Sequence, residues 1–499
     1  MKTELDELTR RLNRITDLGH AAAILEWDQE TYIPDGAHDS RAHQIATLRA
    51  IAHEESTAEA LGNLIAKLSV PGQTDEDAAA LVRVAQRDFE KATKLSTDLV
   101  SRLATAEAIS RDAWRRARES DDFESFAPHL EALIDLNIEK AEALGFHDQL
   151  YDALLDQFEE GLLTRTVDDV FAELRAELVP MVDAIAGADG PGDELLRGSF
   201  DPKQQWKLSL DIARLVGYDF DRGRLDRSVH PFSTAFSIDD VRITSRIEED
   251  FFSPAFYGTL HEVGHALYEQ GIARKFERTP LADGTSLGIH ESQSRLWENL
   301  VGRSRAFVTF YFDRIKTSFP GEFAAATPAD FYRAINAVKP SLIRVEADEL
   351  TYNLHIMIRF ELERLLLDKK LLVRDLPEAW NDLYQRYLGI RPESNANGVL
   401  QDIHWSMGAF GYFPTYALGN LISCQFFDAA KRDLGEIDHQ ISKGSFDPLL
   451  AWLRDKIHRH GRTQTAEQLL RSITGGGLSS ANWLSYVRTK YGQLYDVDL

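Results

Sequence analysis

Cysteine is nearly absent from this chain of 499 residues, since Cys424 is the only one. One thiol excludes an internal disulfide, and its place in an apolar run predicts a buried, unreactive side chain in a reducing compartment. The start of the chain lacks the apolar core of a signal peptide, and no apolar run reaches the roughly 20 residues that cross a bilayer. We therefore expect a cytoplasmic protein with no membrane partner.

Positive charge is also scarce, because 56 Lys and Arg residues face 80 Asp and Glu residues and give a net charge of -24. Such a charge repels phosphate groups and argues against a nucleic acid or an anionic membrane as partner. Hydrophobic residues make up 43% of the chain and charged residues 27%, as in ordinary globular proteins. The composition therefore favours a globular enzyme.

Helical periodicity covers almost the whole chain and predicts a mainly α fold. The strongest loop signal covers residues 187–193, and lesser breaks occur at Pro71–Gly72 and at residues 475–477. Short strands are expected only within residues 228–247, where Val241, Ile243 and Thr244 lie among polar residues. The clearest helical patterns span residues 5–18, 41–53, 76–95, 99–119, 123–144 and 167–186.

The most informative stretch is His261-Glu262-Val263-Gly264-His265. In a helix, the two imidazoles lie one turn apart on the same face and can bind one Zn²⁺ ion at about 2.0–2.1 Å. Glu262 points about 100° away, where it can accept a proton from a water molecule on the metal. This spacing predicts a zinc hydrolase, and the alternative is a helix with two surface histidines.

The residues around this stretch support a helix that carries it. Ser253 is a good N-cap, Pro254 suits the first helical position, and Gly271 stands where a helix would end. The predicted strands come directly before it, so we expect a small sheet next to the metal helix. We expect a single helical domain over residues 1–499, with an N-terminal half to about residue 225 and a metal-site half from about residue 226.

A catalytic zinc ion needs a third protein ligand. The metzincin pattern is absent, because Tyr268 and Gly271 occupy the positions of its glycine and third histidine. Glu269 lies a turn further along the same helix and is poorly placed. Glu291 fits better, since a second helix running back against the first would present it to the histidines. Its alternative role is that of a first-turn carboxylate stabilised by the helix dipole.

Four further polar motifs accompany these two segments: His230-Pro231-Phe232, Asp240-Val241-Arg242-Ile243-Thr244, Ile343-Arg344-Val345-Glu346-Ala347-Asp348, and Gly398-Val399-Leu400-Gln401-Asp402-Ile403-His404-Trp405. Taken in order, the set resembles the carboxypeptidase Taq family of thermostable metallocarboxypeptidases, with its HPF, DxRxT, HExxH, HESQ, IRxxAD and GxxQDxHW motifs. The resemblance runs from near the N-terminus to Tyr416 and beyond. It implies a neurolysin-like helical fold with a deep active-site groove, a homodimer, and peptide substrates with a free C-terminal carboxylate.

The resemblance also implies roles for individual residues. His261, His265 and Glu291 would bind the metal, and Glu262 would be the general base. Two histidines and a glutamate suit Zn²⁺, and Co²⁺ can replace it. His290, beside Glu291, would support the metal site or act as a structural donor.

An exopeptidase must also recognise a carboxylate, for which a guanidinium is the natural partner. We expect Arg344 first and Arg242 second, and the alternative for each is an ion pair, with Asp348 or Asp240. His230 would orient substrate or be structural.

The oxyanion of the reaction needs a donor besides the metal. Tyr412, Tyr416 and His404 are the candidates, in that order, and the alternative for each is a place in the core or in a groove wall. Asp402 would fix the tautomer of His404.

The predicted function is that of a zinc-dependent metallocarboxypeptidase that releases single amino acids from the free C-terminus of peptides. The alternatives are an oligoendopeptidase or dipeptidyl-peptidase of the same helical fold, and a non-catalytic scaffold with a vestigial site. Amidation of the substrate's C-terminus separates the first two classes, because only an exopeptidase requires the free carboxylate.

Overall fold

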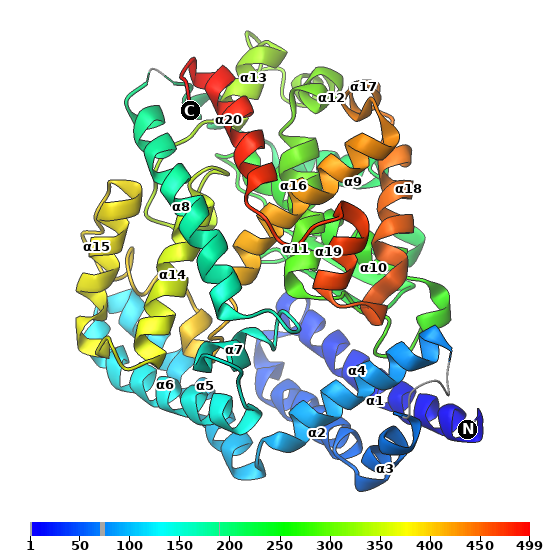
Figure 1. Ribbon diagram of the computed structural model, residues 1–499. Helices are drawn as coiled ribbons and strands as arrows, with labels where there is room; N and C mark the ends of the chain where they lie inside the picture. Colours follow the sequence, from blue (N-terminus) through cyan, green and yellow to red (C-terminus); the bar gives the residue numbers. More distant parts are fainter. Residues whose placement is uncertain (1, 70–74, 189) are drawn as a thin grey trace. The chain divides into compact units, whose positions relative to one another are not determined.

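A computed structural model of the chain describes residues 2–69, 75–188 and 190–499. Most of these residues lie in helices (Figure 1). The strands among them form a three-stranded sheet. The prediction of a mainly α fold with a small sheet is therefore confirmed. The predicted loop at Pro71–Gly72 lies outside the described residues, as does Asp189.

The described residues form two compact units, and each unit draws on three stretches of the chain. The first unit consists of Met1–Thr93, Asp193–Ile335 and Phe426–Gly476, and the second of Lys94–Gly192, Asn336–Gln425 and Gly477–Leu499. The expectation of a single domain, with an N-terminal half to about residue 225 and a metal-site half after it, stays a prediction.

The first unit contains the N-terminal helices and the helices that follow residue 193. The paired helices α1 and α2 lie side by side at its start (Figure 1). Its helices are α1 (Lys2–Thr31), α2 (His38–Ser56), α3 (Glu59–Leu68), α4 (Glu76–Lys94), α9 (Pro202–Leu215), α10 (Ser253–Gly271), α11 (Leu287–Arg295), α12 (Arg305–Ser318), α13 (Pro328–Ile335), α17 (Ile437–Ser442), α18 (Asp447–Lys456) and α19 (Ala466–Thr474).

The second unit is also built from helices, among which α5 packs along α6 and α14 packs along α15. Its helices are α5 (Thr97–Ser120), α6 (Phe123–Leu144), α7 (Leu150–Leu155), α8 (Thr164–Ala186), α14 (Tyr352–Leu367), α15 (Leu376–Leu388) and α20 (Ala481–Tyr495). The residues of α16 (Pro414–Leu434) are divided between the two units. All six ranges with clear helical periodicity coincide with helices.

The sheet of the first unit contains β1 (Leu225–Arg227), β2 (Ser233–Ser237) and β3 (Asp240–Ser245) in the order β1-β3-β2. The central strand β3 is parallel to β1 and antiparallel to β2. Val241 and Ile243 are fully buried, and β3 packs against α10. Because alternate strand residues share a face, these two side chains anchor the sheet on the core beside α10.

Helix α10 is the centre of the first unit, since most of its residues are buried. It ends at Gly271 as predicted, but the N-cap prediction is wrong by one residue. Phe252 is the N-cap and makes no capping hydrogen bond, while Ser253 is the first helical residue. The buried ring of Phe252 packs against Phe256, and Pro254 lies in the first turn, where its missing N–H costs no hydrogen bond.

Two smaller predictions are also tested by the structure. Cys424 is buried and forms no disulfide, as expected. Helix α19 ends at Gly475, whose φ of 78° is a left-handed conformation that glycine tolerates, and this confirms the loop at residues 475–477. Within the described ranges, no helix is long and apolar enough to span a membrane.

Candidate metal centre

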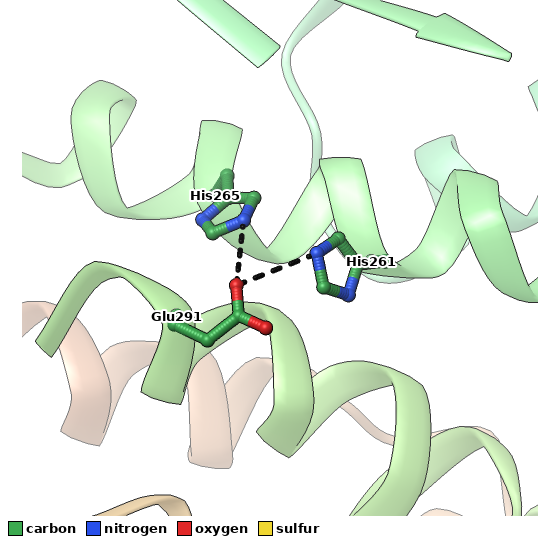
Figure 2. A group of neighbouring side chains, drawn as sticks. All are labelled: His261, His265 and Glu291. Atoms are coloured by element: carbon green, nitrogen blue, oxygen red, sulfur yellow. Dashed lines mark ion pairs between the residues drawn. The ribbon is translucent and has the colours of Figure 1, made fainter. Parts of the chain in front are cut away.

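Two histidines and a glutamate meet where α10 packs on α11 in the first unit (Figure 2). His261 and His265 project from one face of α10, and Glu291 points toward both from α11. Nε2 of His261 lies 3.6 Å from Oε2 of Glu291, and Nε2 of His265 lies 3.4 Å from the same oxygen. One oxygen and two nitrogens therefore converge on a common point.

These three donors fit a metal ion. Ligands at about 2.0–2.1 Å from a tetrahedral ion lie about 3.3–3.4 Å from one another. Both measured nitrogen–oxygen distances are close to that separation, and all three ligand atoms lie within 4.8 Å of one another. Two imidazoles with one carboxylate are a donor set that suits a catalytic zinc ion.

Gly264 determines how closely the two helices approach. A Cβ atom at this position would lie 2.6 Å from the carbonyl oxygen of Gln293 and 2.6 Å from Cα of Ser294. Both are backbone atoms of α11, so neither can move aside without moving the helix that carries Glu291. The absence of a side chain at Gly264 is thus a condition for the short distances at the site.

The second oxygen of Glu291 is held by Arg295, whose Nε donates a hydrogen bond of 2.6 Å to Oε1. Burial alone would raise the pKa of Glu291, but the charges of Arg295 and of the histidines outweigh it and hold that pKa well below its ordinary range. Glu291 is therefore ionised at neutral pH, and its Oε2 is the oxygen that faces both histidines.

His261 is held from behind by Glu298. Its Nδ1 lies 3.0 Å from Oε2 of Glu298, which belongs to a π-helical stretch, η5 (Leu296–Gly302), that continues α11. Arg295 and Arg303 donate to the same carboxylate at 3.4 and 3.3 Å. Burial alone would raise the pKa of Glu298, yet the hydrogen bond with His261 and the arginine charges lower it to about 2.

His265 has a different partner behind it. Its Nδ1 lies 2.5 Å from Nδ1 of His290, and Nε2 of His290 lies 2.7 Å from Oε1 of Glu269. Glu269 comes from the same helix as His265, and the side chains of Glu269 and His290 are largely buried. The residue that seemed a poor metal ligand therefore binds His290, and His290 supports His265.

Glu262 is buried, with 7% of its surface exposed. Burial is the main reason that the pKa of Glu262 is raised to about 7, against the opposing charge of His261. Among the described residues, no hydrogen bond or ion pair ties its carboxylate, in contrast to those of Glu291, Glu298 and Glu269. Its carboxylate is thus able to exchange a proton near neutral pH.

Two predicted substrate residues lie in or near the sheet of the first unit. Arg242 makes two hydrogen bonds of 2.8 Å to Asp240, and its guanidinium lies 4.3 Å from the centre of the Trp27 ring. His230 is exposed, and its backbone carbonyl accepts a hydrogen bond from Ser228. The ion pair named as the alternative role of Arg242 is therefore present.

The other predicted arginine, Arg344, lies in the second unit and is buried. It donates to Oδ1 of Asp402 through Nε at 2.9 Å and Nη2 at 2.8 Å, and Arg359 donates to Oδ2 at 2.6 Å. The expected ionic partner Asp348 instead accepts hydrogen bonds from Thr351 where α14 begins. Two guanidinium groups therefore share a single carboxylate.

The three predicted oxyanion donors gather in the same unit. Nε2 of His404 lies 3.2 Å from the hydroxyl of Tyr416, and the ring centres of Tyr412 and Tyr416 are 5.3 Å apart. Burial is the main reason that the pKa of His404 is lowered to about 4, so its imidazole is neutral at pH 7. Tyr416 also lies 5.0 Å beneath the guanidinium of Arg344, which joins all four side chains in one cluster.

The predicted role of Asp402 as the partner of His404 is wrong. Nδ1 of His404 is 4.0 Å from Oδ1 of Asp402, too far for a hydrogen bond, and it has no other partner among the described residues. Asp402 is occupied by Arg344 and Arg359, whose charges bind it more strongly than a neutral imidazole would.

Glu298, Arg295 and Arg303 were not anticipated from the sequence. Glu298 follows Glu291 by seven residues, about two helical turns, and this spacing alone points to a shared helix face. The spacing does not reveal the π-helical stretch that carries Glu298, so its pairing with His261 is visible only in the structure.

A mainly helical fold with an HExxH helix and a glutamate on the next helix defines a helical metallopeptidase. The family model of the carboxypeptidase Taq (M32) metallopeptidases matches residues 7–491, and the chain belongs to this family. It is accordingly a metallocarboxypeptidase, a peptide hydrolase with a metal cofactor, as predicted.

Relatives match over almost the full length. Thermostable carboxypeptidase 1 of Thermus thermophilus is 42% identical over an alignment of 502 positions that covers 98% of each chain. Carboxypeptidase 1 of Bacillus subtilis is 40% identical, with 97% of each chain covered. The crystal structure of the M32 carboxypeptidase from Deinococcus radiodurans R1 has a TM-score of 0.97 at 42% identity and covers 99% of this chain and 100% of that one.

Proposed function

We propose that this metallocarboxypeptidase is zinc-dependent and releases single amino acids from the free C-terminus of peptides, with Glu262 as general base. The observation that carries the proposal is that Oε2 of Glu291 lies 3.6 Å from Nε2 of His261 and 3.4 Å from Nε2 of His265, close to the separation of two ligands on a tetrahedral ion. Glu262, with its untied carboxylate, follows His261 directly on the same helix. We propose Zn²⁺ as the native ion and Co²⁺ as a functional substitute.

The chain's own residues account for the proton transfers. A zinc ion, when bound, lowers the pKa of a coordinated water to about 7 and polarises a carbonyl group. Glu262 takes the proton of the attacking water and later gives it to the nitrogen of the departing amino acid. Both transfers use the same carboxylate, since the general base of the first step becomes the general acid of the second. No covalent bond between enzyme and substrate is needed.

For the terminal carboxylate of the substrate we propose Arg344 as the principal partner. Arg344 and Arg359 carry two positive charges against the single negative charge of Asp402, and His404 is neutral. A buried guanidinium that shares its carboxylate with a second arginine can bind a further carboxylate strongly. Arg242 is the weaker candidate, since Asp240 already balances its charge.

The remaining substrate contacts are also proposals. Tyr412, Tyr416 and His404 would donate hydrogen bonds to the oxyanion, in that order of preference, and His230 would orient the substrate. A homodimer and a cytoplasmic location are proposed from the sequence alone, and the mass of the protein in solution tests the first.

The decisive substrate test compares a short peptide with a free C-terminus with the same peptide carrying a C-terminal amide. We expect stepwise release of single residues from the free peptide and at least a hundredfold lower rate on the amide. Internal cleavage of the amidated peptide would contradict the proposal and support an oligoendopeptidase. Release of residue pairs would support a dipeptidyl-peptidase.

A further inference from the structure

The two proposed metal histidines are supported from behind by chemically different groups. His261 meets a carboxylate that two arginines hold in place, whereas His265 meets another imidazole. The imidazole of His290 in turn contacts the carboxylate of Glu269 through its other nitrogen, Nε2. The difference matters because a carboxylate can only accept a hydrogen bond from a histidine, whereas a neutral imidazole can either donate or accept one. The partner of His265 therefore has two possible proton arrangements.

The positions of the protons follow from the geometry if His265 offers Nε2 to a metal. That use of Nε2 leaves the proton of a neutral His265 on Nδ1. Nδ1 of His290, 2.5 Å away, must then accept this proton and carry none of its own. The proton of a neutral His290 is therefore on Nε2, which lies 2.7 Å from the carboxylate of Glu269. Each donor in the series meets an acceptor.

The opposite arrangement, with the proton of His290 on Nδ1, does not allow His265 to bind a metal. If His290 carried its proton on Nδ1, that proton would face Nδ1 of His265 and force the proton of His265 onto Nε2. Nε2 of His265 would then point a proton where a metal needs a lone pair. In addition, Nε2 of His290 would carry no proton, and the buried carboxylate of Glu269 would receive no hydrogen bond from it. As long as His290 is neutral, the carboxylate of Glu269 therefore selects the tautomer of His290, and His290 selects that of His265.

We propose that Glu269 and His290 are positioning residues that hold His265 in its metal-binding tautomer and orientation. This inference rests on the proposed metal site. The two residues do for His265, in two steps, what Glu298 does for His261 in one. Outer partners of this kind strengthen metal binding about 10- to 100-fold in other metal sites.

A purely structural role is the competing explanation. His290 packs tightly, since a Cβ on Gly284 would lie 2.7 Å from its Cδ2, and its ring lies 5.3 Å from that of Tyr268. Replacement of His290 or Glu269 would then weaken the folded state without a specific effect on the metal. Metal affinity, measured on folded protein, separates the two roles.

The experiment measures the zinc dissociation constant by competition with a chromophoric chelator, for metal-free protein reloaded with zinc. His290→Phe removes the acceptor for His265, and Glu269→Met removes the acceptor for His290. Glu269→Gln is the matched control within the relay, because its amide oxygen still accepts from Nε2 of His290. Asp239→Asn is the control outside it, since it breaks an exposed ion pair with Arg274 in the same unit.

We expect His290→Phe and Glu269→Met to bind zinc about 10- to 100-fold more weakly than wild type, with both control variants within about threefold of it. Unchanged affinity in the folded His290→Phe and Glu269→Met variants would overturn the inference. If wild type itself bound no zinc, the proposed metal site would fail and the inference with it, so the two failures are distinguishable.

A spectroscopic measurement on the wild-type protein covers the case in which the variants do not fold. With ring-¹⁵N-labelled histidine, the zinc-loaded protein should show His290 as the Nε2–H tautomer and His265 with its proton on Nδ1. A proton on Nδ1 of His290 would contradict the inference whatever the variants do.

Discussion

Gly264 of α10 lies so close to Ser294 of α11 that a Cβ atom at Gly264 would come within 2.6 Å of Cα of Ser294. Glu291 lies one turn before Ser294 on α11, and His261 and His265 flank Gly264 on α10. The helix separation that Gly264 permits is therefore also the separation between the proposed metal ligands.

Gly264→Ala should push the helices apart and weaken both stability and metal binding. We expect a loss of about 1–3 kcal/mol in the free energy of unfolding, as for other overpacked core positions, and at least tenfold weaker zinc binding. Gly258→Ala on the same helix is the matched control, since its Cβ would meet nothing within 4 Å. That change should be neutral or stabilise by up to about 1 kcal/mol, because alanine is the better helix former. Wild-type zinc affinity in Gly264→Ala would contradict the role given to this glycine.

Arg344→Lys keeps the positive charge beside Asp402 but loses the planar fork that binds a carboxylate through two hydrogen bonds. We expect KM for free peptides to rise about tenfold or more, measured by release of the C-terminal residue. Arg359→Lys is the control, because it changes the other partner of Asp402 in the same way. If both variants raise KM equally, the effect comes from the disturbed ion cluster and Arg344 has no special role.

Low pH should reduce the stability of the second unit, because it protonates Asp402. Burial alone would raise the pKa of Asp402, but the charges of Arg344 and Arg359 outweigh it and hold that pKa well below its ordinary value of 3.8. The unfolded chain then binds a proton that the folded chain does not, so the stabilisation is present above about pH 4 and is lost as the pH falls below it. Asp402→Asn lacks this contribution. The difference in unfolding midpoint between wild type and variant should narrow from about pH 5 to pH 3, and a constant difference would refute this account.

Removal of the metal should abolish activity and lower thermal stability together. Because zinc would bind the folded site and not the unfolded chain, zinc at about 100 times its dissociation constant should add roughly 2.7 kcal/mol to the free energy of unfolding. Calorimetry of chelator-treated protein with and without zinc measures this gain. Addition of Co²⁺ to the metal-free protein should restore hydrolysis, whereas Mg²⁺ should not, since it prefers oxygen ligands. Full activity after complete chelation would show that no metal is required.

Local sequence patterns predict much of this molecule. Helical periodicity predicts α6 (Phe123–Leu144) with both ends correct, because an apolar face every three to four residues is a local signal. The HExxH spacing likewise predicts that His261 and His265 share a face of α10, since both ligands belong to one helix. The division into two units is not predictable in this way, because each unit joins three separate stretches of chain.

The parts that the sequence does not reveal depend on long-range packing or on irregular backbone. Glu298 reaches His261 from a π-helical stretch, and no residue pattern here announces that irregularity. Asp402 lies two residues from His404, so proximity in sequence suggests a pair. Arg344 and Arg359, 58 and 43 residues away in sequence, bind Asp402 instead. Competition between near and distant partners is decided by charge and geometry in the folded chain.

The central claim is that Glu262 transfers the proton while His261, His265 and Glu291 hold zinc, and Glu262→Gln tests it most directly. Zinc content and the rate of C-terminal residue release should be measured on the same sample. The account predicts one zinc ion per chain, as in wild type, with kcat lowered about 10²- to 10⁴-fold, the range for loss of a general base. Activity within tenfold of wild type in zinc-loaded Glu262→Gln would contradict the claim.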